Sequence, residues 1–375
     1  MATYWQKRGH EVTGIQARFQ LAWPGFAIDV DLDLPAHGVT ALFGQSGSGK
    51  TTLLRCIAGL ERAPKGRFAI NGEIWQDDEQ NARQGSGHWI PTHQRPLGYV
   101  FQEASLFPHL TVLGNLRYGL RRAANAHQQG LDQAIALLGI GHLLDRKPEG
   151  LSGGERSRIG IARALALRPR LLLMDEPLAA LDVKRKQEIL PYLERLHREL
   201  DIPVIYVSHA ADEIARLADH LVVMESGHAV AVGPLATTLA RLDLPIQLGE
   251  DVGVVLEALV VERDATWHLA RVEFPGGSLW VRDGGMPIGQ VVRVRILARD
   301  VSIALHQVTA TSIQNCLPAT VDELVDDQHP ASSLLRLQVG TMPLLARLTR
   351  RSAMGLGLAP GMHVWAQIKT VALIG

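Results

Sequence analysis

The chain has 375 residues, with 38 lysine and arginine residues against 38 aspartate and glutamate residues, so its formal net charge is zero. At roughly 150 residues per domain, this length favours two or three domains. A hydrophobic fraction of 46% and a charged fraction of 20% exclude a disordered chain. The balanced charge argues against a bulk binder of DNA or RNA, which needs a basic excess, so no nucleic-acid partner is expected.

Residues 1–10 are polar, unlike a signal peptide, and no apolar run approaches the ~20 residues that a membrane helix needs. The two cysteines, Cys56 and Cys316, are too few for a disulfide framework or a structural zinc site. These features favour a soluble, cytoplasmic protein.

The first predicted element is a short buried strand at residues 39–43, followed directly by a glycine-rich stretch and then by apolar residues at helical spacing. Two further apolar runs, at residues 171–174 and 203–207, each end in polar residues that can carry chemistry. Strands that alternate with helices predict an α/β domain with a parallel sheet. The functional loops of such a sheet follow the carboxyl ends of its strands.

The pattern changes beyond about residue 240, where apolar and polar residues alternate and Gly-Gly pairs separate the runs. This alternation predicts an all-β C-terminal portion of one or two compact barrels. The predicted strands lie at residues 252–261, 267–274, 278–282, 290–297, 334–339, 344–348 and 363–373.

The glycine-rich stretch matches the phosphate-binding loop, Gly-x4-Gly-Lys-Thr, at every position, and it lies between a strand and a helix as that loop requires. Its glycines let successive backbone N–H groups face the phosphates of ATP. Lys50 is expected to reach the β- and γ-phosphates, and Thr51 to ligate Mg²⁺. A chance Gly/Ser-rich turn would not explain the flanking elements. The predicted nucleotide-binding residues are Gly44, Gln45, Ser46, Gly47, Ser48, Gly49, Lys50, Thr51 and Thr52.

An acidic pair, Asp175-Glu176, follows the second apolar run. An acidic pair after a buried strand is often only solvated, but beside a phosphate loop it predicts phosphoryl chemistry. Asp175 is expected to hold Mg²⁺, and Glu176 to polarise the attacking water.

Residues 151–155 read Leu-Ser-Gly-Gly-Glu, and this pentapeptide resembles the signature of the ATP-binding subunits of ABC transporters. The resemblance implies a P-loop (RecA-like) ABC ATPase domain with a helical insert. It also implies a homodimer in which Ser152, Gly153 and Gly154 face the γ-phosphate held by the other protomer. A helix cap in a loop is the alternative explanation for this pentapeptide.

Further positions are similar to the same family. Gln102 resembles the glutamine that touches Mg²⁺ and water, and His209 resembles the switch histidine that contacts the γ-phosphate. Asp182 lies in a segment that resembles the one that crosses the dimer interface in the family. Either Trp23 or Phe26 is expected to stack on adenine, although an aromatic there is also a common core residue.

Residues 311–315, which read Thr-Ser-Ile-Gln-Asn, and the pair Lys369-Thr370 resemble molybdate-binding domains of the Mop or TOBE type, an OB-like barrel. Molybdate is a tetrahedral dianion that converging N–H and hydroxyl donors bind well. A purely structural barrel is the alternative. The predicted oxyanion-binding residues are Ser312, Ile313, Gln314, Asn315, Lys369 and Thr370.

Three regions are therefore expected. Residues 1–238 form the ABC ATP-binding domain, with a helical subdomain at approximately 103–165. Residues 239–307 form a β-rich connector, and residues 308–375 form the Mop/TOBE oxyanion-binding domain. Within the first region, residues 103–109 are the candidate for receiving a coupling helix of a membrane subunit.

The resemblance implies a molybdate-importing ATPase, with tungstate as a possible second substrate. Its expected partners are a second ATPase subunit, an integral membrane permease dimer and, indirectly, a periplasmic or extracellular molybdate-binding protein. Its expected location is the cytoplasmic face of the inner membrane, as a peripheral subunit. One alternative is an importer ATPase for sulfate, ferric ion, sugar or polyamine. A soluble ABC ATPase of DNA repair or translation fits less well, because the chain has one phosphate loop and no room for a long coiled-coil insertion.

Overall fold

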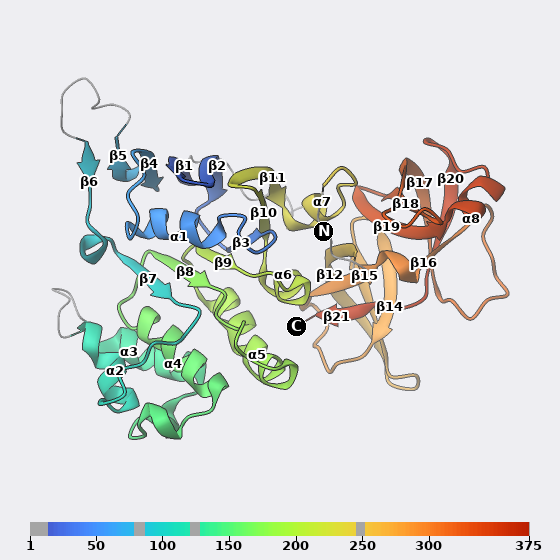
Figure 1. Cartoon of the computed structure of the whole chain (residues 1–375). Coiled ribbons are helices and arrows are strands. Elements are labelled where there is room, and N and C mark those ends of the chain that lie inside the picture. Colours follow the sequence, from blue (N-terminus) through green and yellow to red (C-terminus); the bar gives the residue numbers. More distant parts are fainter. Residues whose placement is uncertain (1–13, 79–86, 121–127, 245–251, 375) are drawn as a thin grey trace. The chain divides into compact units, whose positions relative to one another are not determined.

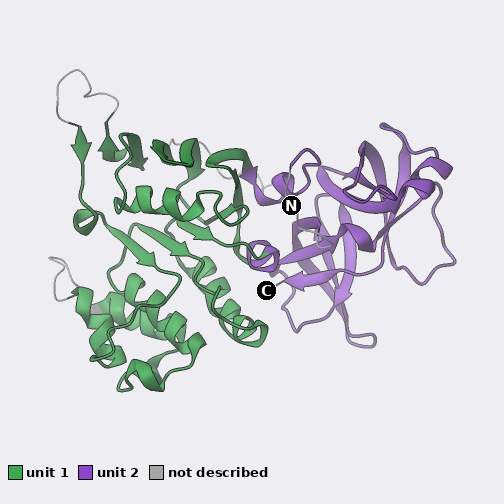
Figure 2. Ribbon diagram, viewed as in Figure 1, with its two compact units in different colours: residues 1–210, 217–232 green, residues 211–216, 233–375 purple. Residues whose placement is uncertain are grey.

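The computed structural model describes residues 14–78, 87–120, 128–244 and 252–374. The polar segment at residues 1–10 lies outside the described residues. The chain divides into two compact units (Figures 1 and 2). Within the described residues, unit 1 comprises 14–210 and 217–232, and unit 2 comprises 211–216 and 233–374.

A six-stranded sheet with the order β11-β10-β3-β9-β8-β7 forms the centre of unit 1, and the neighbours from β10 to β7 pair in parallel. All five residues of β8 are buried, as expected for a strand that has packed layers on both faces. The three strands predicted from apolar runs are confirmed as β3, β9 and β8. The bounds are β3 Val39–Phe43, β7 Leu97–Val100, β8 Leu171–Asp175, β9 Val204–Val207, β10 His220–Glu225 and β11 His228–Pro234.

A second, five-stranded sheet of unit 1 has the order β2-β1-β4-β5-β6. Along β2, buried and exposed residues alternate, so this sheet packs one face on a core and leaves the other in water. Helix α1 (Lys50–Ala58) lies between the two sheets, and apolar residues of all three share one core. The bounds are β1 Gly14–Trp23, β2 Phe26–Pro35, β4 Lys65–Ile70, β5 Glu73–Asp77 and β6 His88–Trp89.

Four more helices of unit 1 pack in a second core, which includes the buried Met174 and Tyr206 of the parallel sheet. Three of them, α2 (Val112–Leu120), α3 (Gln128–Leu138) and α4 (Gly153–Leu165), lie side by side and form the expected helical insert (Figure 1). The fourth is α5 (Val183–Glu199). Among the described residues, no helix is both long enough and apolar enough to cross a membrane.

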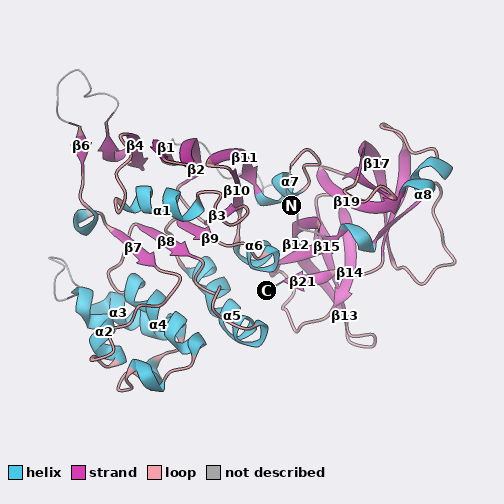
Figure 3. Cartoon of the chain, in the orientation of Figure 1, coloured by secondary structure: helices cyan, strands magenta, loops and turns pink. Residues whose placement is uncertain are grey.

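Unit 2 is built mainly of strands, as Figure 3 shows, and the predicted all-β C-terminal portion is confirmed. It contains two five-stranded sheets with the orders β14-β13-β12-β15-β21 and β16-β20-β17-β18-β19. The bounds are β12 Gly253–Asp264, β13 Leu269–Phe274, β14 Gly277–Arg282, β15 Val291–Leu297, β16 Val301–Ala304, β17 Asn315–Asp326, β18 Ser332–Val339, β19 Met342–Thr349, β20 His363–Ile368 and β21 Ala372–Ile374. Its short helices are α6 Ala211–Leu217, α7 Leu235–Leu239 and α8 Arg350–Gly355.

Both sheets of unit 2 contribute to one hydrophobic core. The core joins residues of β12, such as Val260, to residues of β18, such as Leu335. The last strand, β21, leaves the sheet of its sequence neighbours and pairs with β15. The expected boundary at residue 308 therefore does not separate two independent cores.

Candidate nucleotide-binding site

The loop between β3 and α1 curls because its glycines adopt backbone angles that other residues avoid. Gly47 has φ 82° and Gly49 has φ 103°, both in the left-handed region. A Cβ on Gly49 would lie 3.0 Å from Cζ of Phe26, so a side chain there would press on the ring of that residue. The loop therefore requires glycine for its curvature and for the approach of β2.

Lys50, the first residue of α1, is buried and folds its side chain back onto the loop. Its Nζ donates to the carbonyl oxygens of Gly44 at 2.8 Å and Gln45 at 2.7 Å. Desolvation lowers the pKa of Lys50, although the negative charges of Glu176 and Asp175 oppose that effect. The loop thus holds a desolvated ammonium group at its centre.

Asp175, at the end of β8, receives two hydroxyl donors. Thr51 Oγ1 donates to its Oδ1 at 2.9 Å, and the Tyr99 hydroxyl donates to its Oδ2 at 3.1 Å. Burial raises the pKa of Asp175, and the two hydrogen bonds act in the opposite direction. A hydroxyl and a carboxylate within hydrogen-bond distance are the hard oxygen ligands that Mg²⁺ prefers, so the residues present fit that ion.

Glu176 has φ 46°, which is uncommon for a residue other than glycine. Its backbone N–H donates to the carbonyl of Val207 on β9 at 3.1 Å, and its Oε1 lies 3.3 Å from Nδ1 of His209. The structure therefore brings together two predicted residues from the ends of neighbouring strands, β8 and β9.

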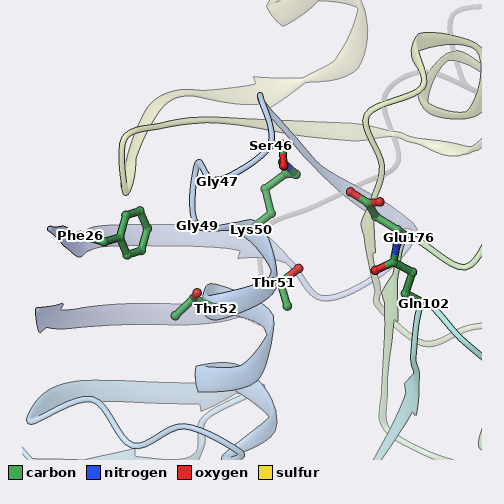
Figure 4. Close-up of a pocket in the computed structure, with 9 residues that line it drawn as sticks. All are labelled: Phe26, Ser46, Gly47, Gly49, Lys50, Thr51, Thr52, Gln102 and Glu176. Carbon is green, nitrogen blue, oxygen red and sulfur yellow. The ribbon is translucent and has the colours of Figure 1, made fainter. Parts of the chain in front are cut away.

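A cavity of about 510 Å³ opens above the loop (Figure 4). In the close-up, Phe26 lies on one side of the loop, and Gln102 and Glu176 lie on the other. The cavity is lined by Phe26, Ser46, Gly47, Gly49, Lys50, Thr51, Thr52, Gln102 and Glu176. Every one of these residues was expected at a nucleotide site from the sequence.

The two candidate aromatic residues face each other across the turn of the β1–β2 hairpin, where Trp23 pairs with Phe26. Their rings stack with centroids 6.2 Å apart and an interplanar angle of 19°. Phe26 lines the cavity, whereas Trp23 is 39% exposed and is not among the lining residues. Of the two candidate rings, that of Phe26 is therefore the one that faces the cavity.

The signature residues do not line this cavity. Ser152 is the N-cap of α4, and its Oγ accepts a hydrogen bond from the backbone N–H of Glu155 at 3.2 Å. The Glu155 carboxylate in turn accepts from the Ser152 N–H at 2.7 Å, which completes a capping box. A hydroxyl has one hydrogen to donate besides its lone pairs, so the cap leaves that donor available. Asp182 caps α5 in a similar way, accepting from the Arg185 N–H at 2.9 Å.

The two predicted oxyanion segments lie together at one end of a sheet in unit 2. Asn315, the first residue of β17, pairs with Ile368, the last residue of β20. Lys369 and Thr370 follow directly and are exposed, as are Ser312 and Gln314. The backbone N–H of Ile313 already donates to Thr311 Oγ1 at 3.1 Å.

The side chain of Asn315 is hydrogen-bonded to the backbone of another strand of unit 2. It accepts a hydrogen bond from the Trp280 N–H at 2.7 Å and donates to the Trp280 carbonyl at 2.9 Å. These bonds join β17 to β14 of the other sheet. The Asn315 side chain therefore stabilises the unit.

Comparisons with known proteins agree with this geometry. The ABC transporter family model matches residues 28–179, and the TOBE domain model matches residues 311–375. The molybdenum import ATP-binding protein ModC of Methylococcus capsulatus is 66% identical over 96% of this chain and 99% of that protein. The ModC of Thiobacillus denitrificans is 67% identical over 96% of this chain and 98% of that protein. The chain belongs to the family of molybdenum import ATP-binding proteins.

A solved structure supports the ABC ATPase fold. The structure of cbiO1 from Clostridium perfringens, part of the ABC transporter complex cbiONQ, matches with a TM-score of 0.52 and 25% identity. The match covers 62% of this chain and 92% of that one. The predicted family and the predicted ABC ATPase fold with a C-terminal TOBE domain are confirmed.

Tyr99 is a site residue that no sequence motif indicates, although its hydroxyl donates to the carboxylate of Asp175. The reason lies in strand pairing. Tyr99 on β7 pairs with Leu173 on β8, and Asp175 lies on the same face as Leu173 because alternate residues of a strand share a face. Only the order of strands in the sheet reveals this contact.

Proposed function

We propose that the chain is the ATP-hydrolysing subunit that energises molybdate import through a membrane permease. The observation that carries the proposal is the cavity over the phosphate loop, which gathers Lys50, Gln102 and Glu176 beside the hydrogen-bonded pair Thr51 and Asp175. The identity of 66% to a molybdenum import ATP-binding protein over almost the whole chain supports the substrate.

The backbone N–H groups of residues 44–49 and the Lys50 ammonium group would bind the phosphates of ATP, and Phe26 would pack on its base. Thr51, Gln102 and Asp175 would hold Mg²⁺, which supplies positive charge to the γ-phosphoryl group when bound. Glu176 would accept a proton from the attacking water, and His209, 3.3 Å from its carboxylate, would contact the γ-phosphate. The Lys50 side chain must leave the carbonyls of Gly44 and Gln45 to reach a phosphate.

The active form in this proposal is a homodimer. Ser152, Gly153 and Gly154 do not line the cavity of their own chain, and the Ser152 hydroxyl retains its donor hydrogen. A second copy would therefore supply these residues to the γ-phosphate, with Asp182 near the interface between the two copies. The N-terminus of α4 adds a partial positive charge at Ser152.

The family also supports partners outside the chain. A peripheral subunit on the cytoplasmic face of the inner membrane, docked on a permease dimer, fits an importer whose substrate arrives on a periplasmic or extracellular binding protein. The exposed donors Ser312, Gln314, Lys369 and Thr370 would form a second, oxyanion-binding site in unit 2, together with the backbone of Asn315. The Ile313 N–H would join them only after leaving Thr311 Oγ1.

Substitution of Glu176 by glutamine tests the catalytic assignment. We expect E176Q to bind ATP and to form a stable dimer with Mg²⁺-ATP, because the amide keeps the shape but cannot accept the proton from water. Size-exclusion chromatography and phosphate release measure the two properties. Hydrolysis by E176Q at the wild-type rate would show that Glu176 is not the base.

The substrate is tested separately on the complex with its permease and binding protein. Molybdate is expected to stimulate ATP hydrolysis, and sulfate to have no effect. Stimulation by sulfate but not by molybdate would contradict the substrate assignment while leaving the ATPase assignment intact.

A further inference from the structure

The residues that follow Gln102 have neither helical nor strand structure, yet α2 holds them firmly. We call residues 103–109 the docking segment. The buried side chain of Asn115 on α2 accepts a hydrogen bond from the Phe107 N–H at 2.7 Å. The same side chain donates to the carbonyls of Phe107 at 3.1 Å and Thr111 at 3.0 Å. The centre of the docking segment is thus fixed to the helical insert.

A second set of bonds ties the docking segment to α4 through Arg163. Its Nη1 donates to the Ser105 carbonyl at 3.0 Å, and its Nη2 donates to the Ala104 carbonyl at 3.1 Å. The guanidinium group also lies 5.6 Å from the ring centroid of Phe107, within cation–π range. One planar side chain therefore contacts three residues of the docking segment, Ala104, Ser105 and Phe107.

Gly160 of α4 faces the same part of the docking segment. Gly160 lies one turn before Arg163, and a Cβ on it would be 3.4 Å from Cβ of Ala104 and 3.7 Å from the Ala104 carbonyl oxygen. Ser105 adopts φ 43°, an uncommon angle for serine. Helix α4 therefore contacts the docking segment through hydrogen bonds, and a methyl group at Gly160 would fit against Ala104 at ordinary van der Waals distance.

The other end of α4 is the signature. Gly153 and Gly154 are its first two residues and Ser152 is its N-cap, whereas Arg163 lies in its last turn. At about 1.5 Å per residue, these two ends are ~15 Å apart along one continuous helix. A displacement of the docking segment that pulls on Arg163 would move α4 as a rod, and so move the signature.

We propose that Arg163 is a positioning residue that transmits displacement of the docking segment to the signature end of α4. This inference rests on the proposed function in one respect, namely that the permease contacts the docking segment. Arg163 touches neither the nucleotide cavity nor the signature itself, so its effect is on coupling and not on the chemical step.

The test compares Arg163→Ala with Arg158→Ala, a matched control on the same helix. Arg158 also donates to a backbone carbonyl, that of Leu138 at 3.1 Å, and its guanidinium lies 4.7 Å from the ring centroid of Tyr192. It makes the same two kinds of contact but holds other elements of unit 1. A general loss of helix packing would therefore affect both variants.

Two rates are measured for each variant in the complete transporter: hydrolysis without substrate and hydrolysis stimulated by the molybdate-loaded binding protein. We expect R163A to keep the unstimulated rate and to lose about tenfold of the stimulation, within the range of ordinary coupling free energies. R158A is expected to keep both rates. R163K retains the charge but not the planar fork, so it is expected to recover only part of the stimulation.

Hydrogen exchange on the purified chain provides a readout that does not depend on transport. R163A is expected to accelerate exchange of amides in residues 103–109, and R158A is expected to leave it unchanged. Full stimulation in R163A, or equal losses in R163A and R158A, would overturn the proposal. A wild-type complex without molybdate stimulation would instead contradict the proposed function, and the exchange experiment would still decide whether Arg163 holds the segment.

Discussion

Glu176 combines a catalytic assignment with a backbone angle that is unfavourable for its type, φ 46°. Residues held in sparsely populated conformations cost ~1–3 kcal/mol each and often lie at functional sites. The N–H of Glu176 donates to the carbonyl of Val207, so backbone pairing between the ends of β8 and β9 helps to hold this angle.

This strain predicts a difference in stability between two variants that lack the proposed base. Glu176→Gly and Glu176→Ala both lack the carboxylate, but only glycine adopts the left-handed region without a steric penalty. We expect the glycine variant to be more stable by about 1 kcal/mol. Thermal unfolding of the two variants measures this difference in stability. Equal stability would show that position 176 carries no strain.

The two aromatic residues of the β1–β2 hairpin give a second prediction at this scale. Phe26→Ala is expected to weaken ATP binding about tenfold, because stacking of a base on an aromatic ring contributes ~1–3 kcal/mol. Trp23→Ala removes a ring that stacks on Phe26 outside the cavity, so its effect is expected to be smaller. Isothermal titration with ATP compares the two. A larger loss for Trp23→Ala would reverse the assignment.

At the scale of elements, α4 depends on its capping box. The N–H of Ser152 donates to the Glu155 carboxylate and holds the pKa of Glu155 below its usual value. A carboxylate with a lowered folded pKa stabilises the protein above its unfolded pKa, about 4.3, and loses that contribution as the pH falls through the folded pKa.

The expected result is a pH-dependent effect of Glu155→Gln. The glutamine keeps a hydrogen-bond acceptor but does not titrate, so the wild type is expected to be the more stable protein at neutral pH. The difference is expected to shrink as the pH falls below about 4.3. Denaturant midpoints across this range measure it. A stability difference that stays constant at all pH values would exclude the carboxylate charge of Glu155 as the source of that difference.

The strands and the phosphate loop of unit 1 were predictable from the sequence, but several side-chain contacts were not. Strands β3, β8 and β9 were predictable because buried parallel strands leave continuous apolar runs, and the phosphate loop because its glycines have fixed spacing. The contacts of Tyr99 and Arg163 were not predictable from the sequence, because they depend on which strands and loops become neighbours in space. The choice between Trp23 and Phe26 likewise required the position of the hairpin relative to Gly49.

At the scale of the whole molecule, the shared core of unit 2 argues against a separable C-terminal domain. Strand β21 pairs with β15, and Asn315 joins β17 to β14. A chain ending at residue 307 would lose β21 and a large part of the core. We expect it to lose the cooperative unfolding of unit 2, as followed by circular dichroism. Unit 1 is intact in this truncated chain, so a second cooperative transition, beyond that of unit 1, would show that residues 239–307 fold alone.

Helix α6 begins two residues after His209 but belongs to unit 2. Arg295 of β15 pairs with Asp212, and Arg293 of the same strand donates to the Arg216 carbonyl at 3.0 Å. The chain thus enters unit 2 at residue 211, returns to unit 1 at residue 217 and enters unit 2 again at residue 233. In a chimera that replaces residues 233–375 by those of a related protein, α6 would stay but Arg293 and Arg295 would be removed. Recombination between related transporters would preserve these contacts only if residues 211–216 were exchanged together with residues 233–375.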